Sequence, residues 1–277
     1  MHPFLQTTLI IEDPSVPLQQ NGLGDFSGCM NHPGGDLISL QRGRTVTRIK
    51  LENRAFYLKR NRLDWRELVK TLLHLKWPPR NALNEWKNIF SVKRIGIPTV
   101  NPVAMGERVL LGLEIGSFII TEELYGAESL EKVIEKTPTD PPPGARHNWK
   151  WCMIRKAAQL TRLLHSSGMC HQDFYLGHIF KDQSDILYLI DLQRVLRREK
   201  TPRRYRVKDL GQLNFSADCT GNFSRTDRMR FFLEYLELNS LNSVEKKLAR
   251  SITSKSDRIA RHTLKLLSRR RRRGEIP

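Results

Sequence analysis

Two aspartates, Asp173 and Asp191, are the residues of this sequence best placed to do chemistry. Asp173 ends the segment His171-Gln172-Asp173, which follows a long amphipathic stretch predicted as a helix and precedes a short predicted hairpin. Its carboxylate should therefore stand on an ordered loop at the edge of a core. Asp191 directly follows the apolar strand predicted over 186–190. A carboxylate at the exit of a buried strand is well placed to bind a metal ion near Asp173.

Three more residues complete a set that suits phosphoryl transfer from ATP. That reaction needs a cation on the phosphates, carboxylates that hold magnesium and a carboxylate that orients the acceptor hydroxyl. Lys59 ends a strand of alternating apolar residues, and Glu85 lies on a helix predicted after it, where it can pair with the lysine. His178 follows Asp173 by five residues, which is the offset of the metal-binding asparagine in the kinase catalytic loop.

Each of these residues alone has an ordinary structural explanation. An aspartate at a strand end is commonly a turn residue or a helix N-cap. A single histidine is commonly half-buried within the fold, and a strand-end lysine or a helix glutamate is commonly solvated. The order of strand lysine, helix glutamate, loop aspartate and strand-end aspartate along one chain is what favours a phosphotransferase.

The predicted elements that hold these residues form two unequal lobes. A hairpin over about 45–59 precedes two helices, over about 64–76 and 82–94. After a proline-rich loop at 138–143, the stretch 147–167 is the clearest helix, and the rest of the chain is mostly helical. Strands with a helix, followed by a mostly helical half, indicate an α+β protein.

We divide the chain into four segments on this basis. Residues 1–37 are rich in glycine, proline and asparagine, show no clear period and are predicted to be a loosely ordered leader. Residues 38–125 are predicted to form the smaller, strand-rich lobe and a hinge. Residues 126–268 are predicted to form the larger helical lobe with the catalytic loop, and 269–277 a basic C-terminal tail.

Composition limits the class of protein and of partner. The 277 residues are 39% hydrophobic and 27% charged, which is typical of a globular chain. The formal charge of +18 favours an anionic partner, namely nucleotide phosphates, an anionic membrane surface or nucleic acid. Four scattered cysteines without a C-x-x-C pair give little support for zinc or disulfides. Without a signal peptide or an apolar run of about 20 residues, we expect a cytoplasmic protein, soluble or peripheral on a membrane.

Several segments together resemble the lipopolysaccharide core heptose kinase family, a bacterial branch of the protein-kinase-like fold. The chain resembles the related 3-deoxy-manno-octulosonate (Kdo) kinases almost as closely. The matching segments stand in family order between about residues 42 and 215, and the most specific is His171-Gln172-Asp173-Phe174-Tyr175-Leu176-Gly177-His178. The others are Ala55-Phe56-Tyr57-Leu58-Lys59, Asn84-Glu85-Trp86, Ser117-Phe118-Ile119-Ile120-Thr121-Glu122-Glu123-Leu124, Ile190-Asp191-Leu192-Gln193-Arg194 and Lys208-Asp209-Leu210.

The resemblance implies a bilobal kinase fold with a C-helix in the small lobe, ATP as donor and Mg²⁺ as cofactor. Lys59 would contact the α- and β-phosphates, and Glu85 would orient it. Asp173 would be the catalytic base for a sugar hydroxyl, and Asp191 and His178 would hold magnesium. The implied acceptor is a lipid-linked saccharide, first of all a heptose of the lipopolysaccharide inner core.

Supporting roles are implied at the matching positions around this centre. Glu122, Glu123 and Leu124 would form the hinge against which adenine packs. His171 and Asp209 would give the catalytic loop structural support, with Asp209 bracing it from the next helix.

The sequence departs from the protein-kinase pattern at three places. Gln172 stands where the His-Arg-Asp motif has arginine, which argues against control by a phosphorylated activation loop. Leu192-Gln193 stands where Phe-Gly follows the metal-binding aspartate, so an in/out switch of that motif is not expected. The glycine-rich loop is reduced to Gly43, and Arg42 or Arg44 would compensate on the phosphates.

The C-terminal part of the chain carries most of the excess charge. Residues 201–277 contain 19 lysines and arginines against 8 acidic residues, a net +11 of the total +18. Ile259, Thr263, Leu266 and Leu267 recur at helical spacing just before the five consecutive arginines. A solvated terminal helix and docking on anionic lipid are both compatible with this pattern.

The leading hypothesis is an ATP- and magnesium-dependent kinase that acts on a lipid-linked saccharide. One alternative is a kinase-fold protein that binds nucleotide with little or no catalysis, which the sparse glycine loop motivates. Another is a kinase for protein or for a different small acceptor, although the missing arginine beside Asp173 counts against protein. A nucleic-acid-binding protein explains only the charge, because no RNA-recognition or zinc motif supports it.

Overall fold

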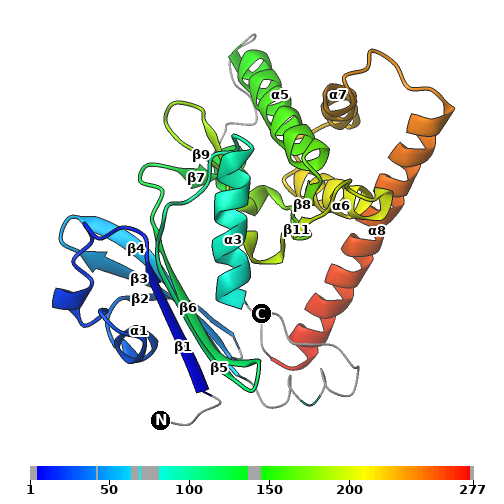
Figure 1. The fold of residues 1–277 in the computed structure, drawn as a ribbon. Coiled ribbons are helices and arrows are strands. Elements are labelled where there is room, and N and C mark those ends of the chain that lie inside the picture. Colours follow the sequence, from blue (N-terminus) through cyan, green and yellow to red (C-terminus); the bar gives the residue numbers. More distant parts are fainter. Residues whose placement is uncertain (1–4, 42, 64–68, 70–80, 137–144, 275–277) are drawn as a thin grey trace. The chain divides into compact units, whose positions relative to one another are not determined.

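The chain folds into two compact units, which we call the strand unit and the helical unit (Figure 1). The computed structural model describes residues 5–41, 43–63, 69, 81–136 and 145–274. The strand unit comprises 1–94, 99–125 and 191–193, and the helical unit 95–98, 126–190 and 194–277. The helix expected over about 64–76, apart from Val69, and the loop at 138–143 lie outside the described residues.

The strand unit contains a six-stranded sheet in the order β1-β5-β6-β4-β3-β2, with antiparallel neighbours throughout. Its strands are β1 (Leu5–Ile11), β2 (Asp36–Gln41), β3 (Arg44–Leu51), β4 (Arg54–Arg62), β5 (Pro102–Leu110) and β6 (Leu113–Glu122). Its described helices are the 3₁₀ helix η1 (Gln19–Asn21), α1 (Phe26–Asn31) and α3 (Asn81–Arg94).

Strand β4 lies inside the sheet between β3 and β6, so its side chains alternate between two covered faces. Phe56 and Leu58 are fully buried on the face that also carries Phe26 of α1. Lys59 points to the opposite face, where α3 packs against β5 and β6. Gly96, just after α3, has φ +84°, a left-handed conformation that commonly ends a helix.

The expectation of a loosely ordered leader over 1–37 is corrected by the structure for residues 5–37, the part of this segment that it describes. Strand β1 pairs with β5 along its whole length, from Leu5 opposite Leu110 to Ile11 opposite Ala104. The following turn and α1 bury a set of apolar side chains in the core beneath the sheet, namely Val16, Leu18, Leu23, Phe26, Cys29 and Met30. These buried residues stand at irregular intervals among glycines, a proline and polar residues, so they show no period in the sequence.

The helical unit is built of α4 (Leu130–Lys136), α5 (Ala145–Ser166), α6 (Arg203–Cys219), α7 (Arg225–Leu236) and α8 (Ser243–Arg272). Its 3₁₀ helix η2 (Leu176–His178) ends the segment predicted to form the catalytic loop, and η3 (Leu192–Arg194) joins the two units along the chain. Short antiparallel strands accompany the loops: β7 (Glu128–Ser129), β8 (Met169–Cys170), β9 (Ile179–Lys181), β10 (Leu187–Leu189) and β11 (Leu196–Arg197).

Local signals fix where these helices begin and end. Ser224 and Asp227 form a capping box at the start of α7, and the Asn242 side chain caps α8. Gly168 after α5 has φ +76°, a conformation that favours glycine. Helix α8 continues to Arg272, so the arginines expected in a separate tail from 269 are largely helical. None of the described helices is long and apolar enough to span a membrane.

Candidate active site

The strand unit brings Lys59 and Glu85 into direct contact. Lys59 Nζ donates to Glu85 Oε1 at 2.5 Å, and the glutamate is only 3% exposed. A buried carboxylate is costly unless a charge pairs with it, so each side chain holds the other in place. The two side chains meet because strand alternation turns Lys59 to the face of the sheet on which α3, the helix that carries Glu85, packs.

Asp191 joins this pair from a distant part of the sequence. Its Oδ1 lies 3.9 Å from Lys59 Nζ and 3.6 Å from Arg44 Nη2. Asn88 of α3 donates to the carbonyl of Leu192 at 2.8 Å and fixes the segment that carries the aspartate. The backbone of Asp191 has φ +56°, a conformation that costs about 1–3 kcal/mol in a non-glycine residue and occurs often at functional sites.

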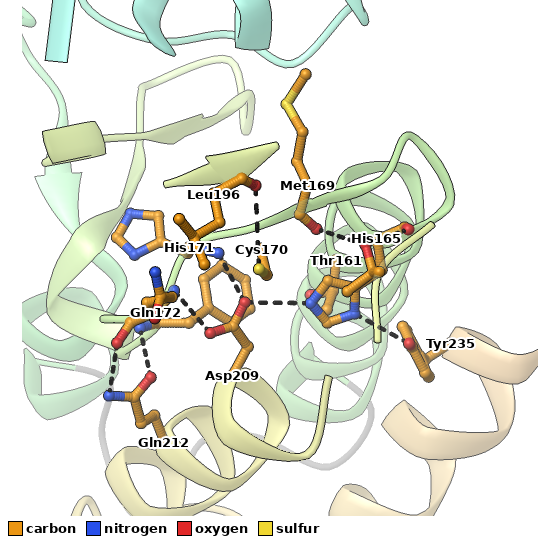
Figure 2. A network of polar contacts seen from close by, with 12 residues as sticks. Thr161, His165, Met169, Cys170, His171, Gln172, Leu196, Asp209, Gln212 and Tyr235 are labelled. Carbon is orange, nitrogen blue, oxygen red and sulfur yellow. Dashed lines mark hydrogen bonds and ion pairs between the residues drawn. The ribbon is translucent and has the colours of Figure 1, made fainter. Parts of the chain in front are cut away.

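The helical unit holds the loop predicted to be catalytic, residues 171–178, through the Asp209 side chain of α6 (Figure 2). The amides of His171 and Gln172 donate to Asp209 Oδ2 and Oδ1 at 2.7 and 2.8 Å. The aspartate is fully buried, and His165 of α5 lies 3.3 Å from it and bonds Tyr235 on its other side. One carboxylate thus satisfies two successive amides, which stabilises the φ of +66° at Gln172.

His171 and His178, the first and last residues of this loop, each hydrogen-bond a backbone carbonyl. His171 Nε2 donates to the carbonyl of Ile190 at 2.9 Å, and His178 Nδ1 donates to the carbonyl of Asp173 at 2.6 Å. Because a carbonyl only accepts, Nδ1 is the nitrogen of His178 that carries a proton in this contact. Nε2 is then the ring atom through which His178 would bind a metal. The Ile190 amide in turn donates to the His178 carbonyl at 3.0 Å, next to Asp191 in the chain.

Asp173 itself presents an accessible carboxylate. Its side chain is 30% exposed, and Arg194 Nη1 lies 3.9 Å from Oδ2.

Two titratable groups near Asp173 have shifted pKa values. Burial lowers the pKa of Lys208, and the charge of Arg194 adds to that effect. Burial also raises the pKa of Tyr175, so its phenol stays a neutral hydrogen-bonding group beside the loop.

Sequence reasoning missed two residues of α6 that hold the same loop. Gln212 Oε1 accepts from the Phe174 amide at 3.1 Å, while its Nε2 donates to the Gln172 carbonyl at 3.1 Å (Figure 2). The same Nε2 also donates to Tyr175 Oη at 3.2 Å. Ser216 Oγ accepts from the Leu176 amide at 3.0 Å. Their spacing of three and seven residues after Asp209 marks one helix face, a signal that polar residues among apolar neighbours could have given.

The residues expected at the adenine hinge use their side chains elsewhere. Glu122 bonds Arg54 and Asn101, both at 3.0 Å. The carboxylate of Glu123 pairs with Arg48 at 2.7 Å and accepts from the Tyr57 hydroxyl at 2.9 Å, and the Arg48 hydrogen bond lowers its pKa. The two side chains therefore stabilise the sheet, and an adenine role for 122–124 stays a prediction.

Gly43, predicted to cover the phosphates, lies in the tight turn between β2 and β3. Its φ is +72° and its carbonyl accepts from the Arg62 amide at 2.7 Å. Arg44 follows it directly and reaches Asp191, so this turn places a cation beside the carboxylate.

The two groups of predicted residues belong to different units. Lys59, Glu85 and Asp191 meet in the strand unit, whereas Asp173 and His178 meet in the helical unit. Within the described residues, no three histidine, cysteine, aspartate or glutamate side chains gather to form a metal cage. Magnesium in phosphotransferases is commonly held by one or two carboxylates together with substrate phosphates. Asp191, flanked by two cations that suit phosphates, fits such a site.

Comparison with known proteins gives consistent matches over most of the chain. Residues 37–235 match the family model described as "Lipopolysaccharide kinase (Kdo/WaaP) family". The chain is 33% identical to the lipopolysaccharide core heptose(I) kinase WaaP of Pseudomonas aeruginosa, over 82% of this chain and 85% of that protein. It is 32% identical to the Escherichia coli K12 protein of the same name, over 83% and 89%.

More distant relatives agree. A 3-deoxy-D-manno-octulosonic acid kinase of Vibrio parahaemolyticus is 22% identical over 69% of this chain and 74% of its own. A solved structure titled "WaaP in complex with acyl carrier protein" matches with a TM-score of 0.69 and 26% identity, covering 91% of this chain and 98% of that one. The structural match confirms the predicted α+β, protein-kinase-like fold class.

Proposed function

The chain belongs to the lipopolysaccharide kinase (Kdo/WaaP) family, and from this membership we propose that it transfers phosphate from ATP to a heptose of the lipopolysaccharide inner core. Its relatives are kinases of lipopolysaccharide sugars, so the chain is a phosphotransferase with a sugar hydroxyl as acceptor. Heptose is favoured over 3-deoxy-manno-octulosonate because the identity is 33% to a heptose(I) kinase and 22% to the 3-deoxy-D-manno-octulosonic acid kinase.

In the proposed reaction each group has one task. Asp173 orients the heptose hydroxyl and takes its proton on a carboxylate oxygen as the hydroxyl attacks the γ-phosphorus of ATP. Lys59, held by Glu85, and Arg44 place positive charge on the phosphates. Asp191 and His178 would hold Mg²⁺, which when bound neutralises charge on the β- and γ-phosphates. The bond from γ-phosphorus to the bridging oxygen breaks, and ADP leaves.

The observation that carries this proposal is the part-buried contact of Lys59 with Glu85 beside Asp191. The test is an incubation of the purified protein with labelled ATP, magnesium and core glycolipid that ends in heptose, beside glycolipid truncated before heptose. We expect label only in the first glycolipid, and none when the metal is chelated. Stabilisation by ATP without transfer to either acceptor would favour the nucleotide-binding alternative instead.

We also propose that the protein works at the cytoplasmic face of the inner membrane, where a lipid-linked core sugar and ATP can meet. The absence of a spanning helix among the described residues leaves peripheral contact as the form of attachment to test. The basic C-terminus supports that contact, because each basic residue near an anionic leaflet contributes about 1 kcal/mol.

A second proposal concerns a partner of this kinase. A solved relative was captured in complex with acyl carrier protein, and the helical unit of this chain contains a partly open, mainly apolar cavity of about 670 Å³ lined by α4, α5, α6, α7 and α8. That volume falls in the range of small-molecule sites, about 300–1,000 Å³. Its apolar walls include Ile134, Met153, Leu213 and Phe232. We propose that the chain binds an acylated carrier protein and takes the acyl chain into this cavity.

Filling the cavity should abolish the preference for the acylated carrier. Ala217 lines the cavity from α6, and Ala217→Trp would occupy the space of the chain. We expect the wild-type protein to bind acylated carrier protein at least about tenfold more tightly than the unacylated carrier, since burial contributes about 0.8 kcal/mol per CH₂. Calorimetric titration measures both affinities. Equal affinity of the wild type for the two carriers would contradict the proposal.

Gln212 should affect turnover without touching substrate. Gln212→Ala leaves the Phe174 amide and the Gln172 carbonyl without their partner, a loss of about 1–3 kcal/mol in unfolding free energy. We expect kcat to fall by about tenfold or more, with KM for ATP unchanged, because the loop that carries Asp173 loosens. Gln212→Glu keeps the oxygen that accepts from the Phe174 amide, so its kcat should lie between those of the wild type and Gln212→Ala. Steady-state kinetics measure the split.

The matched control for this change is Gln159→Ala on the exposed face of α5. It removes the same side chain from the same unit and should leave both kcat and stability unchanged. Equal kcat values for Gln212→Ala and the wild type would show that the loop does not need this brace.

A further inference from the structure

Helix α8 changes character halfway along its length. Its first half packs against α6 and buries Leu248, Ile252 and Ser256. We call residues 258–272 the distal half; Figure 1 shows its red turns running on beyond α6. From Arg261 to Arg272 every residue except Thr263 is exposed. The distal half is roughly 22 Å long at 1.5 Å per residue.

The apolar stripe that packs the first half continues along the distal half. Ile259, Leu266 and Leu267 follow Ile252 by 7, 14 and 15 residues, which places them within about 60° of its direction at 100° per residue. Leu266 and Leu267 are 44% and 42% exposed, and Leu264 beside them is 66% exposed. Leucines in a helix of a globular chain normally face a core, so this stripe has the form of a contact surface.

Positive charge surrounds the stripe. Residues 258–273 contain eight basic side chains and no acidic one. They are all exposed: Arg258, Arg261, Lys265, Arg269, Arg270, Arg271, Arg272 and Arg273. A helix with leucines on one face and arginines around it has the composition of helices that lie in the interface of a lipid bilayer.

We propose that the distal half of α8 docks on an anionic lipid bilayer, with the Ile259–Leu266–Leu267 stripe in the headgroup region and the arginines on lipid phosphates. The long arginine side chains can reach those phosphates from the flanks of the helix. The choice of a membrane rests on the proposed function, because the proposed acceptor is itself lipid-linked. Nucleic acid would also suit the charge, but exposed leucines add nothing to phosphate contacts of that kind.

The charge is tested by vesicle sedimentation of the full chain. The vesicles contain phosphatidylglycerol and phosphatidylcholine, or phosphatidylcholine alone. Each basic residue near an anionic leaflet contributes about fivefold to binding, so R269E with R272E should weaken binding to the anionic vesicles by at least about thirtyfold. The matched control is K246E with K247E, an equal charge change at two exposed lysines in the first half of the helix, which should have little effect.

The apolar stripe has its own test. L266A with L267A should weaken binding to the anionic vesicles by about tenfold while leaving the charge unchanged. Val244→Ala, which trims a 67% exposed apolar residue in the first turn of the same helix, should leave binding unchanged. The helix content and melting temperature of every variant are measured to check that its fold is retained.

The outcomes separate this inference from the proposed function. Vesicle binding is measured without ATP or acceptor, so it holds or fails whether or not the chain is a kinase. On a water-soluble core saccharide without lipid, the α8 variants should phosphorylate as fast as the wild type. Unchanged vesicle binding by L266A with L267A would overturn the inference. So would tighter binding to single-stranded DNA than to anionic vesicles at the same salt concentration.

Discussion

Asp173→Asn is expected to slow phosphoryl transfer by about 10²- to 10⁴-fold, the contribution typical of a general base. Asparagine has the same size but cannot take the proton of the attacking hydroxyl. The change should leave the fold intact, because Asp173 contributes to the loop mainly through its carbonyl, which accepts from His178. Its side chain makes a long contact of 3.9 Å with Arg194 and is 30% exposed.

The measurement is transfer of labelled phosphate from ATP to the heptose-ending glycolipid, with ATP affinity followed in parallel by thermal shift. Asp36→Asn is the control, since Asp36 is an exposed carboxylate on the edge strand β2 with a similarly long contact of 3.9 Å to Arg48. It should retain full activity. Wild-type rates in Asp173→Asn would remove this residue from the chemistry. If Asp173→Asn lost transfer but ATP still raised its melting temperature as in the wild type, Asp173 would act after nucleotide binding.

The parts of the site that the sequence predicted are those that depend on local periodicity. Lys59 follows from strand alternation, and Glu85 from its place on a clear helix nearby. The two residues meet because α3 packs on the face of the sheet to which Lys59 points. Their contact could therefore be predicted from the strand and helix patterns alone. The supporting role of Asp209 came from family resemblance, because a buried carboxylate that accepts backbone amides has no local pattern.

Other features depend on tertiary register and could not be read locally. Gln212 bonds a backbone amide and a carbonyl on a loop 38 and 40 residues away. Its spacing from Asp209 places it on the same helix face, but that spacing does not identify the loop that it bonds. Residues 1–37 were expected to be loose, yet β1 finds its partner β5 about a hundred positions later. The Glu123 side chain, directly after β6, pairs with Arg48 of β3 across 75 positions of sequence, and the adenine role of 122–124 stays a prediction.

Asp191→Asn should abolish the benefit of magnesium while preserving the affinity for metal-free ATP. In the strand unit its Oδ1 stands 3.6 Å from Arg44 and 3.9 Å from Lys59, so the neutral amide leaves two cations that still attract phosphates. We expect transfer to fall by about 10²- to 10³-fold, comparable to loss of one charge-stabilising group.

Calorimetry of ATP binding with chelator and with magnesium separates these effects. In the wild type magnesium should strengthen ATP binding, whereas in Asp191→Asn the two conditions should give similar affinities. Asp13→Asn, which removes a carboxylate 3.2 Å from Arg54 in the same unit, controls for the loss of an arginine partner and should behave as the wild type. If magnesium still strengthened ATP binding in Asp191→Asn as much as in the wild type, the metal would be held by other groups. The left-handed backbone at Asp191 would then need a structural explanation.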